Sequence, residues 1–162
     1  RRKGQVAAPY INHPITVAEQ LAAIGLGGDV DLLMAAVLHD VVEDTDCSSE
    51  DLERAFGPAV TRIVLEVSDD KSLEKERRKA LVVETIAHKS RAARLIKLSD
   101  LIANVRDVLH HPPHWSLERK LRYLDWAQQV GDAAAGTHVV LEGQLQALIT
   151  EARQTLNSQA AT

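Results

Sequence analysis

The sequence predicts an all-α fold. Helix-forming Leu and Ala occur 20 and 22 times among 162 residues, whereas Phe, Trp and Tyr together number five. The aromatic enrichment of a β-sandwich is therefore missing. Apolar residues recur at helical spacing along most of the chain. No internal repeat or Pro/Ser-rich linker divides the sequence, so we expect one helical domain over residues 1–162.

Helices in the first half of the chain are predicted from their starting and ending residues. Pro14 and Pro58 suit the first turn of a helix, and Asp29 and Ser48 or Ser49 can serve as N-caps. Glycines at 27–28 and 57 provide end points. The predicted helices are 14–26, 30–43, 48–56 and 58–67.

The second half continues the same pattern. Ser116 and Thr137 can cap helices, and prolines at 112–113 end the helix before them. The predicted helices are 75–88, 91–110, 116–130 and 137–156. Residues 158–162 are expected to be frayed.

Composition and charge exclude several classes of protein. The balance of 19 basic and 23 acidic residues gives a net charge of −4, which argues against a nucleic-acid partner. No apolar run approaches the ~20 residues of a membrane span, and no signal peptide is present, so we expect no membrane partner. The single cysteine, Cys47, cannot form an internal disulfide, which favours a cytoplasmic location.

The stretch "MAAVLHDVVEDTD" carries four ionisable residues in an otherwise apolar helix: His39, Asp40, Glu43 and Asp44. On one continuous helix they share a patch over a single turn. A lone His-Asp pair often occurs by chance. Three carboxylates and an imidazole in a buried helix, however, are costly unless a cation lies among them. We therefore predict a metal site.

Two other segments supply partners for this site. "PYINHP" places His13 just before a helix start, and "LIKLSDLIANVRD" places Asp100 and Asn104 on one face of another helix. Alone, Asp100 could be a cap or an ion-pair partner, and Asn104 a surface residue. Two His and two Asp form a mixed nitrogen and oxygen donor set, which suits Mn²⁺, Fe²⁺ or Zn²⁺.

This spacing resembles the HD superfamily of metal-dependent phosphohydrolases, and more narrowly the (p)ppGpp hydrolase domain of the RelA/SpoT family. The similar blocks, in order over about residues 1–130, are "RRKG…PYINHP", "AAVLHDVVEDT", "FGPAVTRIVLEVSDDK" and "KLSDLIANVRD". The length resembles the stand-alone small alarmone hydrolases, including the animal type. The resemblance implies an HD-domain helical bundle. The family normally has a helix before "RRK", and we expect that this helix is missing here.

The resemblance also implies roles for individual residues. His13, His39, Asp40 and Asp100 would be the metal ligands, usually for Mn²⁺. Glu43 and Asp44 would handle the attacking water and proton transfer. Five residues would contact the guanine nucleotide (ppGpp or pppGpp): Arg2, Lys3, Asn104, Arg119 and Tyr123. Asn104 could instead support the metal shell. Tyr123 could equally be a half-buried aromatic. The family often has a basic residue where this chain has Leu101.

Further candidate phosphate contacts are Lys71, Lys97 and the basic run at 75–79. The run is more typical of a solvated helix face. Lys97 is favoured because it lies three residues before Asp100 on the same helix face.

The function implied is a metal-dependent 3′-pyrophosphohydrolase that converts ppGpp and water to GDP and pyrophosphate. An NADPH 2′-phosphatase, or another nucleotide phosphohydrolase on the same site, is the nearest alternative. The sequence leaves the choice of substrate, the native metal and the oligomeric state open. A degraded nucleotide sensor would be expected to lose a ligand or the Glu-Asp pair, and all six residues are present. A structural helical module is less favoured still.

Overall fold

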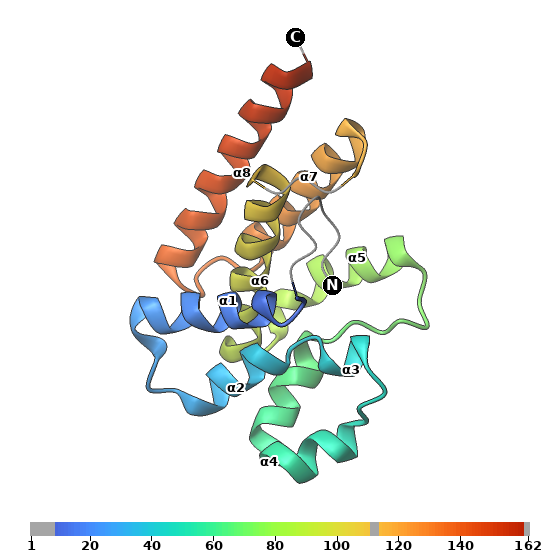
Figure 1. The fold of residues 1–162 in the computed structure, drawn as a ribbon, viewed down its shortest axis with the longest axis vertical. Helices are drawn as coiled ribbons and strands as arrows, with labels where there is room; N and C mark the ends of the chain where they lie inside the picture. The colour runs from blue at the N-terminus through green and yellow to red at the C-terminus, as the bar shows by residue number, and fades with distance from the viewer. Residues whose placement is uncertain (1–8, 111–113, 161–162) are drawn as a thin grey trace.

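The structure, a computed structural model, describes residues 9–110 and 114–160 and is all-α over those residues, as predicted (Figure 1). The α-helices are α1 (Asn12–Leu21), α2 (Val30–Leu38), α3 (Val41–Asp44), α4 (Ser49–Val67), α5 (Lys75–Thr85), α6 (Arg91–His110), α7 (Leu117–Ala133) and α8 (Val139–Ala160). A π-helical segment, Ala22–Leu26, follows α1, and a 3₁₀ turn, Ile86–His88, follows α5.

Helix α6 is the central element of the bundle. It is apolar on several sides, with Leu95, Ile96, Leu98, Leu101 and Ile102 all buried, as expected for a helix enclosed by others. Helices α7 and α8 pack along one half of α6, while α1 and α4 pack against the other (Figure 1). Asp100 of α6 faces the N-terminal half, where it contacts His13 of α1.

Three predicted N-caps are confirmed. Asp29 Oδ1 accepts a hydrogen bond from the Leu32 amide at 3.0 Å, and Ser116 caps α7 in the same way. Ser48 forms a reciprocal capping box with Asp51. The predicted break at Gly57 is also present, because this residue adopts a φ of +82° inside α4.

The first predicted helix is wrong beyond Leu21. The chain continues as the π-helical segment, in which Gly25 has a φ of +90°. Glycine reaches this conformation without a steric penalty. The helix is therefore interrupted at Gly25, before the glycines at 27–28 that were expected to end it.

The predicted helix 30–43 is also wrong, because α2 ends at Leu38 and α3 begins at Val41. His39 supplies the physical reason. Its Nδ1 donates to the Ala36 carbonyl oxygen at 2.7 Å, and this carbonyl would accept from residue 40 in a continuous α-helix. The histidine side chain thus ends α2 beside the predicted metal site.

The last two helices differ from expectation at their ends. α7 continues to Ala133 rather than Val130. Thr137 does not cap α8, because its hydroxyl donates to the Ala134 carbonyl oxygen at 2.6 Å. α8 runs through Ala160, so residues 158–160 are helical rather than frayed. In the described part of the chain, no helix is both long and apolar enough to cross a bilayer.

Candidate metal centre

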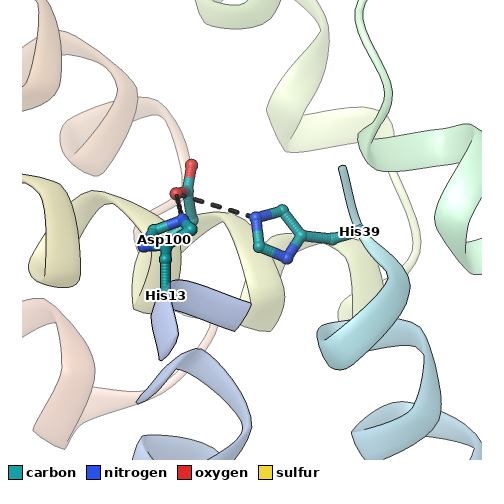
Figure 2. A group of neighbouring side chains, drawn as sticks. All are labelled: His13, His39 and Asp100. Carbon is teal, nitrogen blue, oxygen red and sulfur yellow. Dashed lines mark hydrogen bonds and ion pairs between the residues drawn. The ribbon is translucent and has the colours of Figure 1, made fainter. Parts of the chain in front are cut away.

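Three buried side chains from three separate segments meet at the centre of the bundle (Figure 2). His13 lies in the first turn of α1, His39 directly follows α2, and Asp100 lies midway along α6. One ligand atom from each residue lies within 4.8 Å of the others. The donor set of two imidazoles and one carboxylate is one that binds divalent transition metals. We call these residues the triad.

The distances within the triad show how the side chains converge. His13 Nε2 lies 3.0 Å from Asp100 Oδ1, and His39 Nε2 lies 3.9 Å from the same oxygen. Figure 2 shows both imidazoles directed toward this carboxylate. The aspartate oxygen is therefore shared by the two histidines.

The orientation of His39 fits a metal ligand. The hydrogen bond from Nδ1 to the Ala36 carbonyl fixes the ring and leaves Nε2 as the ligand atom. This Nε2 is buried and makes no hydrogen bond. Buried polar atoms normally have partners, so a cation at the triad would give this nitrogen the partner that it lacks.

Asp40, the fourth predicted ligand, lies next to the triad and contacts it at His39. Its Oδ2 lies 3.3 Å from His39 Nε2 and also accepts a hydrogen bond from the Tyr10 hydroxyl. Sequence reasoning missed Tyr10, although it lies in the "PYINHP" block, three residues before His13. Tyr10 therefore helps to hold the Asp40 carboxylate beside His39.

Asp100 is held by two further residues of α6. Asn104 Nδ2 donates to Asp100 Oδ1 at 2.6 Å, and Lys97 Nζ lies 3.5 Å from Oδ2. Asn104 therefore supports the predicted ligand. Leu101, at the position where a basic residue was expected, is instead buried in the core. The positive charge beside Asp100 comes from Lys97.

The electrostatics favour a cation at this position. Burial opposes the charge on Asp100, but His13, Lys97 and His39 outweigh it and hold its pKa well below the usual range. Burial also opposes protonation of His39, yet Asp40 and Asp100 raise the pKa of His39 to about 9. Without a metal, a proton on His39 balances the carboxylates, and a divalent ion would replace that proton.

Glu43 and Asp44 do not share a single helix face with His39 and Asp40 as predicted, because the helix is interrupted between the two pairs. They contact the segment that follows α4. Glu43 Oε1 accepts the Asp69 amide hydrogen at 2.8 Å, and Asp44 Oδ1 lies 2.8 Å from Lys71 Nζ. Burial raises the pKa of Glu43, whereas Asp44 is half exposed.

Lys97 lies among carboxylates rather than on an open surface. Only 15% of its side chain is exposed. Burial opposes its charge, but Asp100, Asp69 and Glu43 outweigh this effect and raise the pKa of Lys97. The lysine therefore remains charged and connects the triad electrostatically to Glu43.

Arg119 and Tyr123 line a groove of about 990 Å³ between α5 and α7. The Arg119 guanidinium stacks 4.4 Å from the Trp115 ring centroid, and Tyr123 lies between Trp115 and Trp126 at centroid distances of 5.6 and 5.7 Å. Both tryptophans were missed from the sequence, although aromatic residues are rare in this chain. Arg2 and Lys3 lie outside the described residues.

The groove is lined by four cations and three carboxylates, Lys75, Lys79, Arg119 and Arg122 with Glu76, Glu84 and Asp125. Burial lowers the pKa of Lys79, Glu76 opposes this shift, and the neighbouring cations Lys75, Arg119 and Arg122 lower the pKa further. Lys79 Nζ lies 5.5 Å from the Trp126 ring centroid. Aromatic rings beside clustered cations provide both a stacking surface and a site for anionic groups.

Comparisons with known proteins agree with this architecture. A family model described as "HD domain" matches residues 1–124. The Drosophila melanogaster protein named guanosine-3′,5′-bis(diphosphate) 3′-pyrophosphohydrolase MESH1 is 49% identical over 143 residues, which cover 88% of this chain and 80% of that protein. The Homo sapiens MESH1 protein is 45% identical over 152 residues, covering 93% and 85%.

A solved structure described as a metazoan ortholog of SpoT that hydrolyzes ppGpp superimposes with a TM-score of 0.90. It is 47% identical in sequence, and the match covers 93% of this chain and 85% of that one. The family model, the long high-identity matches and the superposition show that the chain belongs to the HD domain family.

Proposed function

We propose that this protein is a metal-dependent guanosine-3′,5′-bis(diphosphate) 3′-pyrophosphohydrolase. The observation that carries the proposal is the buried triad, in which His39 Nε2 has no hydrogen-bond partner. The MESH1 proteins that match most of the chain carry the name of this activity. The single free cysteine, Cys47, is in keeping with a cytoplasmic location for such an enzyme.

The triad and Asp40 would hold the ion, and Mn²⁺ is the ion we propose. A divalent ion there supplies charge that polarises a phosphoryl oxygen and acidifies an attacking water. Asn104 and the Ala36 carbonyl keep Asp100 and His39 in place, as outer hydrogen bonds do in other metal sites.

Glu43 and Asp44 are proposed to move protons. The attacking water bonds to the phosphorus next to the ribose 3′ oxygen, and the bond between this phosphorus and the 3′ oxygen breaks. Glu43 accepts a proton from the water, a role favoured by its raised pKa. The 3′ oxygen takes up a proton delivered through the Glu43-Asp44 pair as GDP leaves, and pyrophosphate is the second product.

The groove between α5 and α7 is proposed to bind the remainder of the nucleotide. Tyr123 and the two tryptophans offer faces for the purine, while Arg119 and the lysines of α5 offer charge for the phosphates. Tyr123 and Arg119 keep the substrate-binding roles expected from the sequence, and Arg2 and Lys3 belong to the same proposal.

Turnover of ppGpp in the presence of Mn²⁺ tests the proposal, with NADPH as the competing substrate. Ion-exchange chromatography should show GDP and pyrophosphate as the first products. Orthophosphate as the first product, or faster turnover of NADPH than of ppGpp at equal concentration, would reject it. The Asp100→Asn variant is the matched control, since it removes one triad charge while preserving side-chain shape.

A further inference from the structure

Lys71 contacts both members of the Glu43-Asp44 pair. Its Nζ lies 2.8 Å from Asp44 Oδ1 and also donates to the main-chain oxygen of Glu43. One ammonium group therefore holds the backbone of the first acidic residue and the side chain of the second. Asp44, in turn, raises the pKa of Lys71, so the lysine remains charged.

The segment around Lys71 makes a further contact with Glu43. The Asp69 amide donates to Glu43 Oε1 at 2.8 Å. This segment has a defined turn, because Asp70 Oδ1 accepts from the Ser72 amide at 2.9 Å and from the Ser72 hydroxyl at 2.6 Å. The segment from Asp69 to Lys71 thus contacts the side chain and the main chain of Glu43 and the side chain of Asp44.

Helix α3 needs such external contacts to hold its position. It has four residues and no side-chain N-cap, and a single turn is not stable by itself because helix nucleation is unfavourable. Its N-terminal end is fixed by the turn at His39 and Asp40. Its C-terminal end, which carries Glu43 and Asp44, is held by the segment after α4.

We propose that Lys71 is a positioning residue for hydrolysis, whose ammonium fixes the end of α3 and keeps Glu43 beside the triad. This inference rests on the proposed function. It replaces the phosphate-contact role suggested by the sequence, since the Lys71 ammonium is already paired with Asp44. The two roles differ in kinetics: a phosphate contact chiefly affects KM, and a positioning contact chiefly affects kcat.

Three variants test this role with ppGpp and Mn²⁺. Lys71→Met should lower kcat by about tenfold to a hundredfold, the range expected for a displaced reacting group, while KM stays within about twofold. Lys71→Arg should recover most of kcat, because guanidinium can also donate to both acceptors. The control is Arg54→Met, which removes a more exposed cation that is also paired with a carboxylate, Asp51 at 3.3 Å, and should leave both constants unchanged.

Hydrogen exchange supplies a readout that does not depend on activity. Protection of the Asp69 and Thr45 amides, which donate to Glu43 Oε1 and the Val41 carbonyl oxygen, should fall in Lys71→Met and not in Arg54→Met. Unchanged protection, unchanged kcat, or a raised KM at constant kcat would each overturn the positioning role. If wild-type protein does not hydrolyse ppGpp, the proposed function fails, and the exchange data alone decide whether Lys71 holds α3.

Discussion

Replacement of Glu43 by Gln removes a negative charge near the triad and leaves the shape of the side chain almost unchanged. Glu43 Oε1 accepts the Asp69 amide hydrogen at 2.8 Å, and the amide oxygen of Gln can accept the same bond. Glu43 is not a member of the triad. We therefore expect Glu43→Gln to fold normally and to retain the metal and the nucleotide.

The rate should fall because an amide cannot accept a proton. Burial raises the pKa of Glu43 above that of an ordinary glutamate, which makes it a stronger base in the site. General acid–base catalysis typically contributes about 10²–10⁴-fold to a rate, or about 2.7–5.4 kcal/mol of barrier. We expect the single-turnover rate to fall by at least about a hundredfold.

Glu66→Gln provides a matched control. Glu66 Oε2 accepts the amide hydrogen of Ser90, 24 residues later in the chain, at 2.8 Å. Glu43 makes the same kind of bond with Asp69, 26 residues later. The assay is rapid-quench single turnover of ppGpp with chromatographic separation of GDP, beside metal content per chain. A near wild-type rate for Glu43→Gln, or an equal loss in Glu66→Gln, would refute proton transfer by Glu43.

Four other outcomes are expected. Chelation should abolish turnover, and Mn²⁺ at about a hundred times its Kd should restore it. At that concentration Mn²⁺ should add about 2.7 kcal/mol to the free energy of unfolding, which corresponds to a rise in Tm of roughly 5–10 °C. An unchanged Tm would contradict a bound ion. Because the metal-free pKa of His39 is about 9, bound protons compete with the metal below that pH. Mn²⁺ affinity should therefore rise up to about tenfold per unit from pH 7 toward 9 and then level off, as measured by calorimetry. Asp100→Asn should lose metal and turnover together, whereas Asn104→Ala should weaken metal affinity by about 10–100-fold. Equal metal content in the wild type and both variants would oppose this. Asp44→Asn should retain metal but lose about a hundredfold in single-turnover rate, and a near wild-type rate would limit Asp44 to a structural contact.

Helix positions could be predicted from the sequence wherever the signal is local. Asp29, Ser48 and Ser116 cap the helices they were expected to cap, because a side-chain oxygen and an amide two or three residues later suffice. The ends of α1 and α2 could not be predicted in this way. The end of α1 depends on which of three nearby glycines adopts a positive φ, and the end of α2 depends on the rotamer of His39. Only the packed structure defines both.

The convergence of His13, His39 and Asp100 was expected from the sequence, and the structure brings these residues together. Their role as metal ligands stays a prediction. The different surroundings of Glu43 and Asp44 were not predicted, because they depend on a segment about 26 residues away that supplies the Asp69 amide. Aromatic residues of the groove were missed because their ring contacts join residues on different turns of α7 and the segment before it.

The separation of the triad along the chain affects how the protein is made. His13 and Asp100 are 87 residues apart, and closing a loop of that length costs entropy that only the packed bundle repays. A nascent chain that ends before Asp100 has both histidines but lacks the carboxylate that they share. The proposed metal site can therefore form only after α6 has been synthesised and packed against α1 and α2.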